Sequence, residues 1–350
     1  MSERLRVGVV GTGFIGTVHA HAVRAAGAEL VAVAASTADR SADAARRLGA
    51  GRGTTAEELV SAADVDVVHV ASPDDTHVPL ARAAVAAGKA VICEKPLATD
   101  LDDARALTDF ATERHAVTAV PFVYRFYPTV REARARIAAG DAGALHLLYG
   151  GYLQDWQLES GAGWRGQGGA GRTFADVGIH WCDLAEFVTG HRIVRLLATL
   201  ASDGASVTIV FATDRGATGS ATISQAAIGR KNQLAISIDG ERASYGFDQE
   251  QPETLTVRSL EGTLALPRGS AAMSKDAGAY SRIPAGHPQG YQDCFDAFVV
   301  DTYAAVTGER PDGLPGFADG LRAAALTDAV VTSATTSTWV GIAPPGRSTP

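Results

Sequence analysis

The 350-residue sequence has few cysteines, no excess of positive charge and no long apolar run. Its three cysteines, Cys93, Cys182 and Cys294, are an odd number at wide spacings, which argues against a disulfide framework and favours reduced thiols. The 31 Lys and Arg against 39 Asp and Glu give a net charge of −8, so neither nucleic acid nor an anionic membrane is expected as a partner. No window approaches the roughly 18 apolar residues of a membrane span, and no signal peptide is recognisable, so we expect a cytoplasmic protein.

With 46% hydrophobic and 20% charged residues, the chain is globular and long enough for about two domains. Residues 1–122 alternate short apolar runs with Ala-rich helical stretches, which is typical of βαβ units in a parallel sheet. The expected strands are Val7-Val10, Leu30-Ala34, Val65-Ala71, Ala90-Cys93 and Val117-Ala119. These five strands and their helices predict an N-terminal Rossmann domain with a doubly wound parallel sheet, the dinucleotide-binding half of an α/β protein.

Residues 123–350 have a different pattern, in which alternating segments dominate between about 145 and 257. Asp239-Gly240 is a hairpin turn signal, and helices are expected near 175–189, 291–307 and 318–334. This half predicts an α+β domain built on a mainly antiparallel open sheet, for substrate binding and oligomerisation. Because the edges of such a sheet need covering, we expect a homodimer or homotetramer formed sheet face to sheet face.

The segment Gly11-Thr12-Gly13-Phe14-Ile15-Gly16 follows the first strand directly and opens a helix. In this GxGxxG pattern, the first glycine makes the turn, the second admits a pyrophosphate to the helix N-terminus, and the third lets helix and strand pack. The context of strand, turn and helix predicts a dinucleotide site. The cofactor is expected to be NAD or NADP.

The end of the second strand leaves the choice between the two nucleotides open. No acid stands at Ser36 or Thr37, where a carboxylate would take the adenosine ribose hydroxyls. These hydroxyls with Arg40 can hold the 2′-phosphate of NADP, whereas Asp39 can turn in and serve NAD. Asp39 and Arg40 can also be only the solvated first turn of a helix.

Glu94-Lys95-Pro96 ends a predicted parallel strand at the carboxyl edge of the sheet, where ligands of open α/β sheets bind. Lys95 there can donate to a substrate oxygen and stabilise developing alkoxide charge. The alternative is a surface ion pair between Glu94 and Lys95.

Asp176, His180 and Asp183 stand at i, i+4 and i+7, on one face of an expected helix. A histidine there suits proton transfer near neutrality, and the carboxylates can orient it and hold sugar hydroxyls. A metal site on this face, or a merely structural polar face, is the alternative. We expect no metal, because no additional ligand run accompanies the three residues.

The order of these motifs resembles the Gfo/Idh/MocA family of NAD(P)-dependent oxidoreductases over nearly the whole chain. Ser72-Pro73 to His77 is similar to the family segment that lines the nicotinamide side. Tyr152-Leu153-Gln154-Asp155-Trp156 and Trp164-Arg165 are similar to a subgroup of sugar dehydrogenases that includes levoglucosan dehydrogenase.

The resemblance implies roles for residues of both halves. Lys95 would bind and polarise the reacting oxygen, His180 would be the general acid/base, and Asp176 would orient the site and share the proton. The resemblance also implies a cofactor site of Gly11, Thr12, Gly13, Phe14, Ile15, Gly16, Ser36, Thr37, Arg40, Ser72, Pro73, His77, Glu94, Lys95 and Arg125. The implied substrate site is formed by Lys95, Tyr124, Gln154, Trp156, Trp164, Arg165, Asp176, His180 and Asp183.

The function implied is oxidation of a ring hydroxyl of a sugar, anhydrosugar, glycoside or polyol by hydride transfer to nicotinamide. A redox-neutral NAD-dependent glycosidase, which oxidises C3 transiently and eliminates the aglycone, uses the same set of motifs. A non-enzymatic NAD(P)-binding sensor is disfavoured, because Lys95, Asp176 and His180 are all present.

Overall fold

The computed structural model describes residues 4–159, 169–201 and 204–343 of the chain. By their contacts, these residues form two compact units, which are described separately: Met1–Val123 with Tyr291–Ala324, and Tyr124–Gly290 with Ala325–Pro350. The first break adjoins the expected boundary after residue 122. Residues 291–324, which the sequence analysis assigned to the second half, have their contacts in the first unit, because helix α11 (Tyr291–Val306) packs on α1 (Phe14–Ala25) and buries Phe295 and Phe298 there.

The first unit contains a six-stranded parallel sheet in the order β3-β2-β1-β4-β5-β6. This confirms the doubly wound parallel sheet. Its strands are β1 (Arg6–Val10), β2 (Glu29–Ala34), β3 (Arg52–Thr54), β4 (Val67–Val70), β5 (Ala90–Cys93) and β6 (Thr118–Ala119). Besides α1 and α11, its helices are α2 (Ala38–Leu48), α3 (Ala56–Ser61), α4 (His77–Ala86) and α5 (Leu101–Glu113), with a 3₁₀ turn at Asp74–Thr76.

Local sequence explains where these helices begin. The Thr37 hydroxyl accepts from the Arg40 N–H at the start of α2, and Asp100 accepts from two N–H groups at the start of α5. Thr55 and Glu58 form a capping box at α3. Each cap satisfies backbone donors that the first turn of a helix leaves without an intrahelical partner.

The second unit contains a nine-stranded sheet in the order β14-β13-β12-β11-β7-β10-β9-β8-β15. All of its pairings are antiparallel except β7 with β10, so the expectation of a mainly antiparallel sheet is confirmed. The strands are β7 (Leu145–Leu153), β8 (Ile193–Leu200), β9 (Ser206–Thr213), β10 (Thr218–Ser224), β11 (Gln233–Gly240), β12 (Ser244–Asp248), β13 (Thr254–Ser259), β14 (Gly262–Pro267) and β15 (Val340–Gly341).

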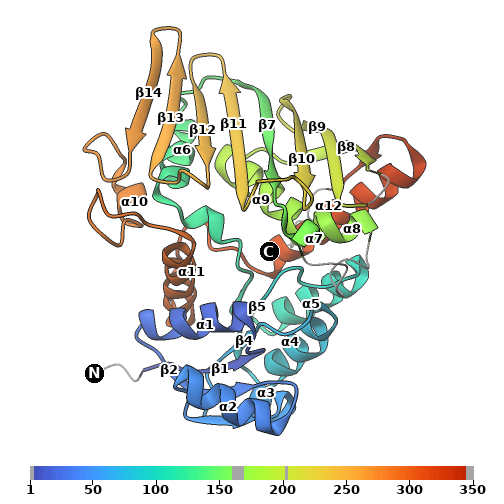
Figure 1. Cartoon of the computed structure of the whole chain (residues 1–350), viewed down its shortest axis with the longest axis vertical. Helices are drawn as coiled ribbons and strands as arrows, with labels where there is room; N and C mark the ends of the chain where they lie inside the picture. Colours follow the sequence, from blue (N-terminus) through green and yellow to red (C-terminus); the bar gives the residue numbers. More distant parts are fainter. Residues whose placement is uncertain (1–3, 160–168, 202–203, 344–350) are drawn as a thin grey trace. The chain divides into compact units, whose positions relative to one another are not determined.

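Helices cover one face of this sheet (Figure 1). Contacts place α6 (Pro128–Ala138) against β12 and β13, and α9 (Ile179–Thr189) against β7 and β11. The remaining helices of the chain are α7 (Trp156–Glu159), α8 (Gly169–Thr173), α10 (Lys275–Gly278) and α12 (Phe317–Thr336), with a 3₁₀ turn at Val123–Phe126. By its contacts, α12 belongs to the first unit up to Ala324 and to the second unit from Ala325 on. The fold is therefore α/β overall, with α+β architecture in the second unit.

The parallel pair β7 and β10 determines where polar side chains meet in the second unit. Leu153 and Ser224 are paired at the carboxyl ends of the two strands, so Gln154 and Gln225 leave the sheet side by side. The adjacent strand β11 runs the opposite way and begins at the same edge, directly after Asn232. Gln154 is thus brought to the same edge as Gln225 and Asn232, which lie about 70 to 80 residues later in the sequence.

Three strands were not expected from the sequence: β3, β14 and the two-residue strand β15. Strand β3 has exposed or half-buried residues and no apolar run, and it pairs only with β2. Strand β14 is likewise mostly exposed at the sheet edge. Strands β3 and β14 lie at sheet edges and have no row of buried apolar residues, so hydrophobic periodicity does not reveal them.

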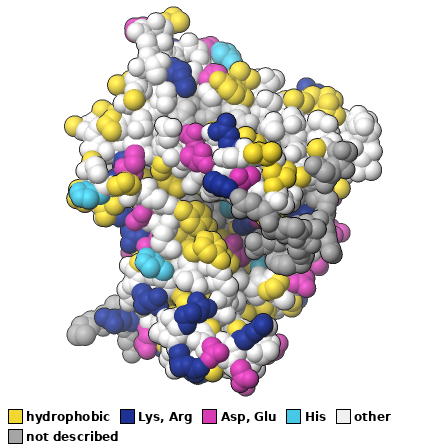
Figure 2. All heavy atoms as spheres, viewed as in Figure 1, with side chains coloured by type: hydrophobic (Ala, Val, Ile, Leu, Met, Phe, Trp, Pro, Cys, Tyr) yellow, Lys and Arg dark blue, Asp and Glu magenta, His cyan; other side chains and the backbone are white. Residues whose placement is uncertain are grey.

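The surface and core agree with the composition. Figure 2 shows basic and acidic side chains intermixed on the face drawn there. Cys93, Cys182 and Cys294 are buried, and none of the three is in a disulfide. Burial raises the pKa of Cys93 well above its ordinary value. Within the described ranges, no helix is both long and apolar enough to cross a membrane.

Candidate active site

Residues Gly11 to Gly16 form the turn from β1 into α1. Gly11 has φ of +94°, and an added Cβ there would lie 2.1 Å from the carbonyl oxygen of Ala71. A Cβ on Gly16 would lie 2.0 Å from the oxygen of Gly11, whereas one on Gly13 would meet nothing within 4 Å. Gly13 is the exposed N-cap of α1, without a side-chain cap or an acidic residue in the first turn. This open helix N-terminus fits the pyrophosphate of a dinucleotide.

Hydroxyl and guanidinium groups gather at the end of β2. Arg40 donates from Nη1 to the Ser36 hydroxyl at 3.0 Å, and Thr37 caps α2. Arg47, from the last turn of α2, donates to the Thr12 oxygen at 2.8 Å and to the Thr17 hydroxyl at 3.2 Å. Sequence reasoning missed Arg47, because only the packing of α2 shows that its side chain reaches the glycine turn.

The loops that follow β4 and β5 are tied together by His77. Its Nδ1 lies 2.7 Å from the Pro96 oxygen and its Nε2 lies 2.9 Å from the Ser72 oxygen. The His77 ring is buried at the start of α4, and Pro73 lies in the segment between β4 and α4. His77 therefore braces the loops, and the direct contacts of Ser72, Pro73 and His77 with a cofactor stay a prediction.

Glu94 and Lys95 stand directly after β5. Glu94 is buried, and its Oε1 lies 3.1 Å from His19 Nε2, while its Oε2 accepts from the backbone N–H of Lys95 at 3.2 Å. A buried carboxylate with these partners is not one half of a surface ion pair. Lys95 is half-buried at the carboxyl edge of the parallel sheet, where ligands of such sheets bind.

Asp176 and His180 lie where a π-helical turn, Phe174–Gly178, leads into α9. The sequence predicted a regular helix here, and π-turns of this kind are frequent at functional sites. Gln225 donates from Nε2 to Asp176 Oδ2 at 2.6 Å. The buried ring of His180 packs edge-on against Tyr124, at 5.3 Å between ring centroids.

A chain of polar side chains continues from Tyr124 along the edge formed by β7, β10 and β11. Tyr152 donates to Asn232 Oδ1 at 2.7 Å, so the 2.6 Å contact between the two tyrosine hydroxyls is donated by Tyr124. Gln154 also donates to Asn232 Oδ1, and Trp156 Nε1 donates to Gln154. The two tyrosine rings of this chain lie against His180. Its hydroxyls, amides and indole ring are groups that can bind a polyhydroxylated ring.

Asp183 and Arg125 are paired with each other. Arg125 donates from Nε to Asp183 Oδ2 at 2.8 Å and from Nη2 to Oδ1, and both side chains are buried. A two-pronged pair of this kind fixes both groups. The sequence assigned Asp183 to the sugar and Arg125 to the nicotinamide; both roles stay predictions, and the pairing shows that neither can change without affecting the other.

Two of the predicted site residues lie outside the described part of the chain, and two further residues of the candidate site were not predicted. Trp164 and Arg165 lie outside the described residues. Gln225 and Asn232, which hold Asp176 and Tyr152, were missed by sequence reasoning, and Tyr152 was noticed only as part of a resemblance. The sequence shows only that Gln225 and Asn232 stand at or near the ends of predicted strands. It does not show which strands are neighbours, so it does not bring these two residues to the site.

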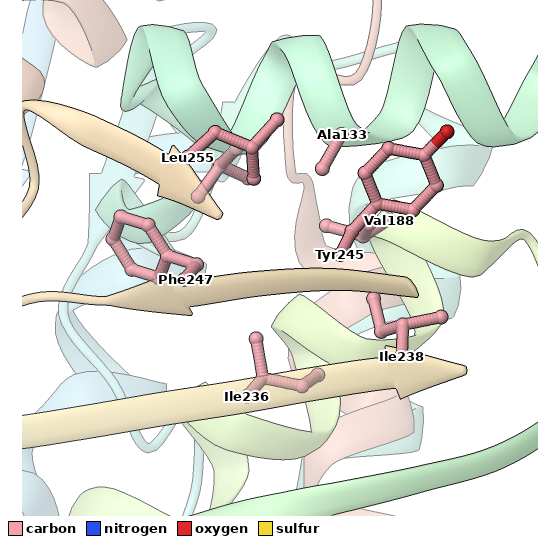
Figure 3. Close-up of a pocket in the computed structure, with 8 residues that line it drawn as sticks. Ala133, Val188, Ile236, Ile238, Tyr245, Phe247 and Leu255 are labelled. Atoms are coloured by element: carbon pink, nitrogen blue, oxygen red, sulfur yellow. The ribbon is translucent and has the colours of Figure 1, made fainter. Parts of the chain in front are cut away.

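The small cavity of the second unit is not part of this site (Figure 3). About 10 Å³ of space lies between sheet and helices, and its lining is apolar: Val130, Ala133, Val188, Ile236, Ile238, Tyr245, Phe247 and Leu255. This is roughly the space of one water molecule, so a sugar does not fit. In the part of the chain that the structure describes, no group of three His, Cys, Asp or Glu side chains could hold a metal ion.

Comparison with known families gives two adjoining matches. Residues 5–122 match the oxidoreductase family with an NAD-binding Rossmann fold, Gfo/Idh/MocA, and residues 130–246 match a Gfo/Idh/MocA C-terminal domain. The first match confirms the prediction of a nicotinamide dinucleotide as cofactor.

Curated relatives and solved structures extend the similarity over nearly the whole chain. Levoglucosan dehydrogenase of Pseudarthrobacter phenanthrenivorans is 31% identical over 97% of this chain and 98% of its own. Inositol 2-dehydrogenase of Rubrobacter xylanophilus is 31% identical over 95% and 91%. A structure of levoglucosan dehydrogenase in complex with NADH and levoglucosan superposes with a TM-score of 0.89 at 28% identity, covering 97% of this chain and 100% of that chain.

The two matches and the relatives agree with the glycine turn, the parallel sheet and the α+β unit described above. The chain belongs to the Gfo/Idh/MocA family of NAD-binding oxidoreductases, which includes sugar and polyol dehydrogenases.

Proposed function

We propose that this protein is an NAD(P)-dependent dehydrogenase that oxidises a ring hydroxyl of a sugar, anhydrosugar, glycoside or polyol. The observation that carries the proposal is the surrounding of His180: Asp176 held by Gln225 on the π-turn, next to the polar chain from Tyr124 to Trp156. This places an acid/base candidate among groups that hydrogen-bond to hydroxyls. The names of the relatives, levoglucosan and inositol dehydrogenases, support a compact polyhydroxylated ring as substrate.

The residues have distinct roles in the proposed reaction. The Lys95 ammonium donates to the reacting oxygen and stabilises alkoxide character as it develops. His180 takes the hydroxyl proton as general base, and Asp176, oriented by Gln225, holds the imidazole in position and shares the proton. Bound NAD or NADP supplies the hydride acceptor.

The ring-binding role of the polar chain follows from its geometry. Trp156 donates its indole N–H to Gln154, and its ring is the group that we propose contacts an apolar sugar face. Gln154 has its amide N–H committed to Asn232 and its oxygen to Trp156, so its orientation is fixed. The sequence also predicts Trp164 and Arg165 as sugar-binding residues, and both lie outside the described residues.

For the nucleotide, we propose that both NAD and NADP are accepted. The exposed Ser36 hydroxyl and the Arg40 guanidinium are 3.0 Å apart, and neither carries a negative charge that would repel a 2′-phosphate. Arg47 adds a second guanidinium at the glycine turn. Hydroxyls of a plain ribose can bond to the same groups.

The test is a panel of sugars, anhydrosugars, polyols and aryl glycosides with each nucleotide, followed by the absorbance of reduced nicotinamide. Stoichiometric NADH or NADPH formation from one substrate class supports the proposal. His180→Ala should lower the rate of that signal by about 10²–10⁴-fold. His146→Ala, a change of an exposed histidine on β7, should preserve it. Cleavage of an aryl glycoside with only catalytic NAD and no net NADH would replace the proposal by the redox-neutral glycosidase.

We also propose that the open face of the nine-stranded sheet forms a homo-oligomer, a dimer or tetramer. Tyr149 and Val210 lie in one register row across β7, β10 and β9, on the face opposite the helices, and are 44% and 40% exposed. Val210→Arg should therefore lower the molecular mass measured by light scattering, whereas Ser61→Arg on α3 should not. A wild-type protein that is monomeric at micromolar concentration would contradict the proposal.

A further inference from the structure

Four titratable side chains form a buried chain in the first unit, apart from the groups proposed for the chemistry. They are His19 on α1, His69 on β4, Glu94 at the end of β5 and Tyr303 on α11, each more than nine-tenths buried. The Tyr303 hydroxyl lies 2.9 Å from His69 Nε2, His69 Nδ1 lies 2.9 Å from His19 Nδ1, and His19 Nε2 lies 3.1 Å from Glu94 Oε1. The contacts connect a helix, two strands and a second helix.

When Glu94 is a carboxylate and both imidazole rings are neutral, the hydrogen bonds among these four side chains can be donated in only one direction. A carboxylate only accepts, so His19 Nε2 carries a proton and donates, and a neutral His19 then accepts at Nδ1. His69 must donate from Nδ1 to His19 and accept at Nε2 from the Tyr303 hydroxyl. Every contact is then satisfied with both rings neutral. This agrees with burial, which lowers the pKa of His69 and raises that of Tyr303.

The chain ends on the backbone of Lys95. Glu94 uses Oε1 for His19 and Oε2 for the Lys95 N–H, at 3.2 Å, so both carboxylate oxygens are held. His19 belongs to the helix whose first turn is the proposed pyrophosphate site. The same helix is joined to α11 by Gln292, which donates to the Val18 oxygen at 3.3 Å.

We propose that His19 and His69 are positioning residues for Lys95: they orient the Glu94 carboxylate, which holds the Lys95 backbone, and they tie the cofactor-binding helix to this strand end. The inference rests on the proposed function of Lys95. Buried polar groups cost free energy unless they are fully hydrogen-bonded, and apolar side chains of similar size would pack here without that cost. The chain fixes the direction of one carboxylate, which apolar packing would leave undetermined.

The kinetic test compares His19→Leu with His19→Gln in two backgrounds. Leu removes the donor to Glu94, whereas the Gln side-chain amide can donate from nearly the same position. We expect His19→Leu to lower kcat by roughly 100-fold, as for a displacement of about 1 Å at a catalytic group, with the Kd of NADH within about threefold of wild type. His19→Gln should recover most of the loss, and His21→Gln on the exposed side of the same helix should leave kcat unchanged.

The second background is Lys95→Ala. If the chain acts through Lys95, His19→Leu should cost nothing further there, because the two changes remove one function. An equal loss in both backgrounds would overturn the positioning role. If Lys95→Ala alone keeps the wild-type kcat, the proposed function of Lys95 fails instead, so the two failures are distinguishable.

A measurement on the wild-type protein remains decisive even if His19→Leu does not fold. Nitrogen NMR of protein labelled with ¹⁵N-histidine should show His69 as the Nδ1–H tautomer and His19 as the Nε2–H tautomer. Tyr303→Phe, which removes only the hydroxyl, should shift the His69 resonances and identify them. The opposite tautomers, or a charged imidazolium at either position, would overturn the inference.

Discussion

Substitution of Gly13 by valine separates cofactor binding from folding. Gly13 has φ of −72° and ψ of −159°, which side chains adopt readily, and its Cβ position faces open space. The added isopropyl group would stand in front of the first-turn N–H groups of α1, where the pyrophosphate is expected. Gly16 lies in the same turn without such room, since its Cβ would clash with the Gly11 carbonyl.

The expected magnitudes follow from these two positions. Valine is less favourable than glycine at an N-cap by about 1 kcal/mol. This lowers Tm by roughly 2–4 °C for a unit of about 150–250 residues, the size range of the unit that contains Gly13. Two charge-assisted hydrogen bonds to the pyrophosphate are worth about 1.5–3 kcal/mol each. Their loss raises the Kd of NADH by about 100-fold or more.

The assay is a fluorescence titration with NADH together with thermal unfolding followed by circular dichroism. Gly16→Ala is the matched control: its 2.0 Å contact forces the backbone to move, so its Tm should fall much further than that of Gly13→Val. A Gly13→Val protein with the wild-type Kd would show that the pyrophosphate binds elsewhere. A fall in Tm as large as for Gly16→Ala would refute the open space at Gly13.

Four further outcomes are expected. Lys95→Ala and His180→Ala should each lower kcat by about 10²–10⁴-fold, and the double variant should lose less than the product of the two. Ser36→Asp should shift kcat/KM from NADP toward NAD by roughly tenfold, through repulsion of the 2′-phosphate. Gln225→Leu removes the 2.6 Å donor to Asp176 and should lower kcat at least about tenfold. His69 stays neutral in the folded protein but takes a proton below about pH 6.5 in the unfolded protein. The free energy of unfolding measured with urea should therefore be lower at pH 5.5 than at pH 7.5, by at most about 1.4 kcal/mol per pH unit. His69→Gln should reduce this dependence on pH.

The parts of the fold that could be predicted from the sequence are those determined by neighbours in the chain. The glycine turn is a contiguous motif between a buried strand and a helix, so residues 11–16 suffice to predict it. The parallel sheet follows from the alternation of apolar runs and helices. Strand β3 has no apolar run, so local pattern does not assign it to the sheet. Helix α11 looks like any amphipathic helix, so local pattern does not assign it to the first unit.

The candidate site likewise contains residues that local pattern predicts and residues that only the strand pairing brings in. Asp176 and His180 could be predicted because one turn of helix brings them together, although the π-turn that carries Asp176 could not. Gln225 and Asn232 belong to the site only because β10 pairs parallel with β7, and β11 antiparallel, a choice that depends on the whole sheet. Local pattern can therefore predict the side chains proposed for the chemistry. The side chains that hydrogen-bond to them can be identified only when the pairing of the strands is known.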